Sequence, residues 1–196
     1  MASQTTHYLI LPGWQGSPDD HWQSHWQRSL PNASRVEQAD WHNPDPHSWV
    51  AALERQVAAA RSPLILVAHS LGCITVARWA AQAPLASLRK VRGALLVAPA
   101  DVERSAVPAA LAGFGPIPRA PLPFPAVVVA SSNDPYCLPV RAAALAAAWQ
   151  APVEWLSGAG HINAGSGLGG WQEGERYLQR LYEQLQAGPA RIAVGE

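Results

Sequence analysis

One serine, one histidine and two aspartates follow short apolar runs in an order that suits nucleophilic catalysis. Ser70 stands in Ala68-His69-Ser70-Leu71-Gly72, directly after an apolar run. A serine hydroxyl becomes a nucleophile when a histidine removes its proton and a carboxylate orients that histidine. Small residues two positions before and two after the serine permit a sharp turn from strand to helix. We therefore predict that Ser70 is the nucleophile of an acyl-transfer reaction, rather than a serine that only caps a helix.

His161 and Asp134 are the predicted partners of this serine. His161 alone of the seven histidines follows Ser70, and it lies in a glycine-rich loop after the last apolar run. Asp134 follows the run over 126–130, and Asp101 follows the preceding run. Asp134 is favoured because the chain order serine, acid, histidine usually places the acid after the penultimate strand. Asp134 is also expected to form an Asx turn before Pro135, which is compatible with this role. Asp101 is the rival acid, and otherwise a candidate for hydrogen bonding at the substrate site.

Two backbone N–H groups are candidates for an oxyanion hole, which binds the negative oxygen of a tetrahedral intermediate. The N–H of Leu71 lies where the next helix begins, and a helix N-terminus favours negative charge. The second candidate is the N–H of Trp14, in the Pro12-Gly13-Trp14 turn after the first apolar run. A simple turn with a core tryptophan is an equally good interpretation of that segment. Trp22 and His69 are further candidates for contact with substrate.

Three other patterns receive structural interpretations. His21 and His25 share one face of a predicted helix, but two histidines do not complete a zinc site. The glycines of 165–170 match a dinucleotide-binding pattern, but no βαβ unit follows them, so a hinge for the histidine loop explains them better. Cys73 and Cys137 are expected to be small buried hydrophobic residues. We expect no metal and no cofactor.

Short strands separated by helices must position these side chains. Nearly continuous apolar runs are typical of strands covered on both faces of a parallel sheet. The predicted strands cover 8–11, 64–68, 94–98 and 126–130, with weaker candidates over 35–38 and 153–156. Helices are predicted over 47–60, 71–83, 139–149 and 171–185. This order predicts an α/β fold with a compact, doubly wound, mostly parallel six-stranded sheet. Residues 99–125 are expected to form a flap over the site or a surface meander.

Several motifs together resemble a known family. They are Pro12-Gly-Trp-Gln-Gly-Ser17, Asp20-His-Trp-Gln-Ser-His-Trp26, Ala68-His-Ser-Leu-Gly72, Ala98-Pro-Ala-Asp101, Asn133-Asp-Pro135 and Gly160-His-Ile-Asn163. The chain is similar to the small serine hydrolases of the retinoblastoma-binding-protein-nine/YdeN type. The resemblance implies an α/β-hydrolase fold without a cap domain and a Ser70–Asp134–His161 triad. The nearest string to a retinoblastoma-binding motif, at 71–75, ends in threonine within a predicted helix, so no such partner is expected.

Composition narrows the function further. The 196 residues include 14 basic and 14 acidic side chains, so the formal net charge is zero and a nucleic-acid partner is not expected. No apolar run is long enough to span a bilayer, and two cysteines do not build a disulfide framework, so we expect a cytoplasmic protein without a membrane partner.

One domain over 1–186 and a frayed tail over 187–196 are predicted. The expected activity is hydrolysis of an ester, thioester or amide of a small or exposed acyl group; an acyltransferase, a peptidase and a non-catalytic binding protein are the alternatives.

Overall fold

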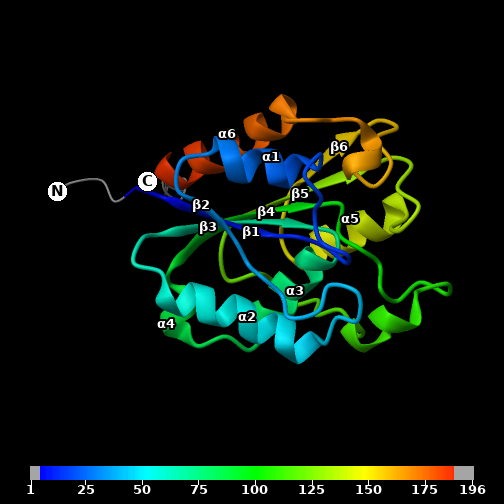
Figure 1. The fold of residues 1–196 in the computed structure, drawn as a ribbon, viewed down its shortest axis with the longest axis horizontal. Helices are drawn as coiled ribbons and strands as arrows, with labels where there is room; N and C mark the ends of the chain where they lie inside the picture. The colour runs from blue at the N-terminus through cyan, green and yellow to red at the C-terminus, as the bar shows by residue number, and fades with distance from the viewer. Residues whose placement is uncertain (1–4, 188–196) are drawn as a thin grey trace, which may run out of the picture.

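A six-stranded sheet forms the centre of the molecule in the computed structural model, which describes residues 5–187 (Figure 1). All strand pairs are parallel, and the order across the sheet is β2-β1-β3-β4-β5-β6. The strands are β1 (His7–Leu11), β2 (Ala33–Arg35), β3 (Leu64–His69), β4 (Val91–Val97), β5 (Ala126–Ser131) and β6 (Val153–Leu156). The predicted doubly wound α/β sheet is confirmed, and it is wholly rather than mostly parallel.

Helices cover both faces of the sheet, which explains the continuous apolar runs of its central strands. In β3, Leu64 and Leu66 pack into one core layer while Ile65 and Val67 pack into the other. The first layer contains α2 (Pro46–Ala59), α3 (Leu71–Ala80) and α5 (Pro139–Ala148), with the short α4 (Leu85–Leu88) beside α2. The second contains α1 (Trp22–Ser29) and α6 (Gln172–Ala187), which lie together across the sheet from α2 in Figure 1.

Local sequence accounts for where the main helices begin. The Asp45 side chain accepts a hydrogen bond from the Ser48 N–H and caps α2, with Pro46 in its first turn. Pro139 likewise opens α5. The helices predicted over 47–60, 71–83, 139–149 and 171–185 are confirmed, with ends that differ by at most three residues. These differences fall at helix termini, where capping and fraying decide the boundary.

Two strand predictions need correction. The strand predicted over 35–38 is found at Ala33–Arg35, because β2 is a three-residue edge strand paired only with β1 and its residues are only partly buried. The strand predicted over 94–98 begins at Val91, although Arg92 and Gly93 interrupt the apolar run. A Cβ on Gly93 would lie 3.1 Å from a Leu185 methyl group, so α6 packs against the sheet at this glycine.

The segment over 99–125 contains a short 3₁₀ helix, η1 (Ala109–Phe114), and the described residues form no separate cap domain over the sheet. Among the described residues, no helix combines the length and apolar character needed to cross a bilayer. Apart from Ala187, which ends α6, the tail predicted over 187–196 lies outside the described residues.

Candidate active site

The turn at Ser70 joins β3 to α3 and holds the residue in an unusual backbone conformation. Ser70 has φ 55° and ψ −119°, outside the regions that most non-glycine residues adopt. Close packing around the turn demands small residues. A Cβ on Gly72 would lie 2.4 Å from the Leu11 carbonyl oxygen, and Ala68 is completely buried. The sharp strand-to-helix turn predicted from the sequence therefore has a direct steric basis.

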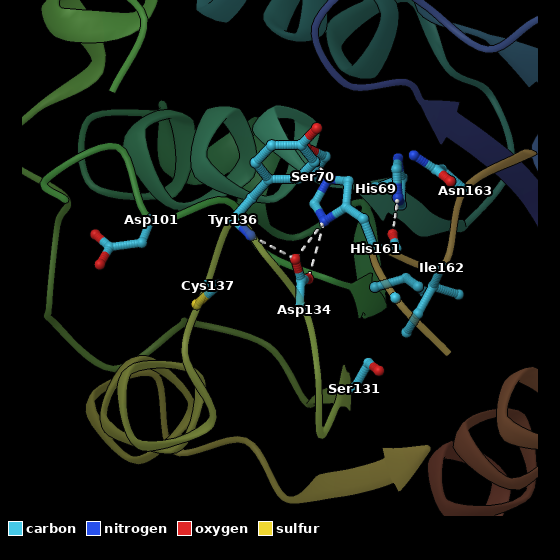
Figure 2. A network of polar contacts seen from close by, with 12 residues as sticks. His69, Ser70, Asp101, Ser131, Asp134, Tyr136, Cys137, His161, Ile162 and Asn163 are labelled. Atoms are coloured by element: carbon cyan, nitrogen blue, oxygen red, sulfur yellow. Dashed lines mark hydrogen bonds and ion pairs between the residues drawn. The ribbon is translucent and has the colours of Figure 1, made fainter. Parts of the chain in front are cut away.

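The structure brings Ser70, His161 and Asp134 into one hydrogen-bonded series (Figure 2). His161 Nε2 lies 2.8 Å from Ser70 Oγ, and His161 Nδ1 lies 3.0 and 2.9 Å from the two carboxylate oxygens of Asp134. A carboxylate beside Nδ1 keeps the proton on that nitrogen. Nε2 then carries the lone pair that accepts the serine proton. All three side chains are buried, which strengthens their electrostatic interactions.

The loop after β5 fixes the position of Asp134. Its Oδ1 accepts a hydrogen bond from the Tyr136 N–H at 2.8 Å, which forms the expected Asx turn. The neighbouring Asn133 Oδ1 accepts bonds from the Ser131 hydroxyl and from the Gly160 N–H, at 2.9 and 2.7 Å. Asn133 therefore ties the acid loop to the histidine loop.

Asp101, the rival acid, belongs to a different network. Its Oδ2 lies 3.2 Å from Arg141 Nε, and its Oδ1 accepts a hydrogen bond from the Glu103 N–H. Figure 2 shows its carboxylate apart from Asp134 and His161. Asp101 connects the loop after β4 to α5 and is absent from the lining of the cleft, so its predicted substrate contact does not match its position.

The two candidate oxyanion donors lie on segments that meet at Ser70. A Cβ on Gly13 would lie 2.7 Å from Ser70 Cβ, so the loop after β1 lies directly against the serine. Trp14 follows Gly13, and Leu71 begins α3. Within residues 5–187, neither backbone N–H donates to another protein group, while the Trp14 indole donates to the His42 carbonyl. Both backbone donors thus lack an acceptor among the described residues.

Three buried aromatic side chains support the histidine loop (157–163). His69 Nε2 donates to the carbonyl oxygen of His161 at 2.9 Å, and Trp22 Nε1 donates to that of Ile162 at 2.8 Å. The His21 ring packs edge-on against His69 with 4.8 Å between ring centroids. Trp22 is buried beneath the cleft rather than on its wall, which corrects its predicted role in substrate contact. His69 does line the cleft.

Burial keeps two of these histidines neutral. Desolvation, with repulsion from neighbouring cationic groups, lowers the pKa of His21 to about 4. Desolvation also lowers the pKa of His69 well below its ordinary value, and potential positive charge on His161 and His21 acts in the same direction. At neutral pH, both rings therefore serve as hydrogen-bonding and packing groups without adding charge beside His161.

A cleft of about 390 Å³ opens over Ser70 and His161. This volume lies at the lower end of the range for small-molecule sites. The loops after the parallel strands contribute its walls, as is usual at the carboxyl edge of an open sheet. Wall residues include Trp14 and Gln15 after β1, Ala100 and Arg104 after β4, Tyr136 after β5, and Asn163 and Gly165 after β6.

The two cysteines and His21 have structural rather than catalytic or metal-binding roles in these surroundings. Cys73 and Cys137 are both buried, and desolvation raises the pKa of each thiol, to about 12 for Cys137. Both therefore remain protonated, which makes them poor nucleophiles. His21 Nδ1 accepts a hydrogen bond from the Gln23 N–H and caps α1. In the part of the chain that the structure describes, no three His, Cys, Asp or Glu side chains gather in a possible metal site.

Sequence reasoning missed Asn133, Tyr136 and Arg104 as parts of this site. The position of Asn133 directly before the acid is a signal that could have identified it. Tyr136 packs its ring edge-on to His161 at 4.7 Å between centroids, and Arg104 lies in the Pro/Ala-rich segment after β4. No motif marks either residue.

The chain is similar to proteins of a known family and to several solved structures. A family model described as serine hydrolase matches residues 8–180. Among solved structures, the chain is similar to a protein described as a YdeN-like hydrolase from Pectobacterium atrosepticum, with 34% identity over 92% of each chain and a TM-score of 0.81. The ydeN gene product of B. subtilis has 18% identity and a TM-score of 0.74, over 92% of this chain and 100% of that one.

The fold extends to more distant proteins. Est1E from Butyrivibrio proteoclasticus has 11% identity and a TM-score of 0.66, over 93% of this chain and 90% of that one. Identity at this level shows a shared fold alone. A comparison with curated proteins finds no match.

Proposed function

The chain belongs to the serine hydrolase family, and from this premise we propose that it cleaves an ester, thioester or amide through an acyl-enzyme intermediate on Ser70. The observation that carries the proposal is the hydrogen-bonded series from Ser70 Oγ through the His161 imidazole to the Asp134 carboxylate. A binding protein has no need of this arrangement. The strained turn at Ser70 supports the same assignment, because it places the serine at the floor of the cleft, at the end of a buried strand.

In the first half-reaction, His161 Nε2 takes the proton of Ser70 as Oγ attacks the substrate carbonyl carbon. The carbonyl π electrons move to oxygen, and the N–H groups of Leu71 and Trp14 stabilise that negative charge. Asp134 stabilises the imidazolium and holds its orientation. His161 then gives its proton to the leaving alcohol, thiol or amine as the carbon–heteroatom bond breaks, which leaves Ser70 acylated.

In the second half-reaction, water replaces the leaving group in the same geometry. His161 removes a proton from water, the resulting hydroxide adds to the acyl carbonyl, and collapse of the intermediate returns the proton to Ser70 Oγ. An acyltransferase or peptidase would share the first half-reaction, because these classes differ only in the substrate or the acyl acceptor. We favour hydrolysis of small or exposed acyl groups because the cleft of about 390 Å³ has no cap domain over it.

A panel of short-chain and long-chain 4-nitrophenyl esters, thioesters and amides tests this function. We expect wild-type protein to hydrolyse short acyl substrates, and Ser70→Ala to lose at least about a thousandfold in kcat. Activity should be lost in acid, since an imidazolium at His161 has no lone pair with which to accept the serine proton. Equal rates for wild type and Ser70→Ala, or a strict requirement for long acyl chains, would contradict the proposal.

A further inference from the structure

The wall of the catalytic cleft carries one fixed charge. Among the described residues that line the cleft, none is an aspartate or glutamate, and Arg104 is the one arginine or lysine. Burial keeps His21 and His69, which also line it, neutral at ordinary pH. A guanidinium group retains its charge at all accessible pH values. The cleft therefore presents a cation to a bound molecule, beside apolar residues such as Leu111 and Pro108.

Protein contacts hold Arg104 in place without neutralising it. Its Nη1 donates to the Asp101 carbonyl oxygen at 2.9 Å, and its Cζ lies 5.4 Å from the centroid of the Tyr136 ring. That ring in turn packs edge-on against His161 at 4.7 Å between centroids. Arg104 is thus joined through a single side chain to the catalytic base. It is only partly buried, so part of its guanidinium group remains accessible.

The neighbouring carboxylates are engaged by other arginines. Asp101 pairs with Arg141, and Glu103 pairs with both Arg119 and Arg141. Within the described part of the chain, Arg104 forms no ion pair. An arginine that is oriented by backbone and aromatic contacts, but unpaired at a cleft wall, is well suited to bind a planar carboxylate through its remaining N–H groups.

We propose that Arg104 forms an anion-binding subsite, and that the substrate carries a free carboxylate in addition to the carbonyl group attacked by Ser70. This inference rests on the proposed hydrolase function and narrows its substrate class. The carboxylate belongs either to the acyl portion, as in a half-ester of a dicarboxylic acid, or to the alcohol portion. A carboxylate in either position would bind Arg104 in the same way, and matched substrates distinguish the two positions.

Two substrate pairs test the subsite. The acyl pair is the mono-4-nitrophenyl ester of adipic acid and its methyl-capped neutral counterpart, followed through nitrophenolate. The alcohol pair is 3-acetoxybenzoate and 3-acetoxybenzamide, followed through the released phenol. We expect wild type to prefer the anionic member of one pair by about tenfold in kcat/KM, the range of a charge-assisted hydrogen bond. Arg104→Gln should abolish that preference, and Arg104→Lys should keep part of it.

Arg55→Gln is the matched control, because Arg55 is an exposed arginine on α2 outside the cleft and its loss changes net charge equally. It should keep the preference, and higher salt should reduce the preference in wild type. Equal kcat/KM for both members of each pair, or a preference unchanged in Arg104→Gln, would overturn the subsite.

A binding measurement separates failure of the subsite from failure of the hydrolase proposal. Adipate is titrated into Ser70→Ala protein, with and without Arg104→Gln, and followed by NMR. Weaker binding in the Arg104→Gln background, by about tenfold, supports the subsite even if no ester is cleaved. Equal affinity in the two backgrounds contradicts it even if neutral esters are cleaved.

Discussion

Ser70 has a backbone conformation that the surrounding hydrogen bonds maintain. Its N–H donates to the Val97 carbonyl at 3.0 Å, and its own carbonyl accepts from the N–H groups of Cys73 and Ala100, at 3.0 and 3.4 Å. A residue in so sparsely populated a region costs about 1–3 kcal/mol. These bonds from β4 and α3 offset that cost. Backbone contacts therefore position Ser70, the proposed nucleophile, beside the His161 and Asp134 side chains.

Gly13 is the residue whose replacement tests this positioning. In Gly13→Ala the new Cβ would lie 2.7 Å from Ser70 Cβ and 3.2 Å from Ser70 Oγ, so one of the two loops must move. We expect kcat/KM for a short ester to fall by about a hundredfold, because small displacements of reacting groups have effects of this size. Steady-state kinetics measures this fall in kcat/KM, and thermal unfolding measures any change in melting temperature.

Gly170→Ala is the control for this substitution. A Cβ on Gly170 would meet nothing within 4 Å, and the residue lies outside the cleft. It should keep both activity and melting temperature near wild type. If Gly13→Ala hydrolyses esters as fast as Gly170→Ala, the loop after β1 does not fix the nucleophile.

At the scale of elements, α1 and Trp171, the residue just before α6, form an aromatic support beneath the histidine loop. Trp22 and Trp26 of α1 pack against each other and against Trp171, with ring centroids 4.8 to 5.8 Å apart. Trp22 Nε1 donates to the Ile162 carbonyl and Trp26 Nε1 donates to the Gly170 carbonyl. α1 therefore bonds to the segment between β6 and α6 at two points, Ile162 and Gly170. His161 owes its position to this support as well as to Asp134.

Trp22→Phe removes one of these bonds while it keeps an aromatic ring in the core. We expect kcat to fall by about tenfold, because the Ile162 carbonyl loses its donor and His161 becomes less well oriented. The free energy of unfolding should fall by about 1–3 kcal/mol, since a buried acceptor is left unsatisfied. Ester hydrolysis at a temperature well below unfolding, with urea denaturation, gives both values.

Trp79→Phe provides the comparison on the opposite face of the sheet. Trp79 is also buried, and its Nε1 donates to Glu54 rather than to the histidine loop. A similar loss of stability with little change in kcat is the expected result. Equal losses of kcat in the two variants would mean that the tryptophans act only through general stability.

The sequence predicted much of this arrangement because its signals are local. Continuous apolar runs mark β3 and β5, and the pattern around Ser70 encodes its own turn, so these elements and the residues at their ends could be found. The short edge strand β2 has no comparable run, because only one neighbour and partial burial constrain it. Trp22 could not be assigned because its partner Ile162 lies 140 residues away in the sequence. Arg104 could not be found because its contacts, not its neighbours in the chain, place it in the cleft.

At the scale of the whole molecule, the parallel sheet explains why residues so far apart in the chain form one site. Every strand ends at the same edge, so the loops after β1, β3, β4, β5 and β6 meet around Ser70. Helices pack on both faces of the sheet, and the absence of a cap domain among the described residues leaves the cleft accessible.

Covalent labelling with a fluorophosphonate tests the central claim most directly, because it reports activation of the serine without knowledge of the substrate. Intact-mass and peptide measurements should find one adduct, on Ser70, in wild-type protein. Ser70→Ala should show none, and His161→Gln should react at least about a hundredfold more slowly, because the hydroxyl loses its general base. An unlabelled wild type, an adduct on another residue, or equal labelling of Ser70→Ala would contradict the account.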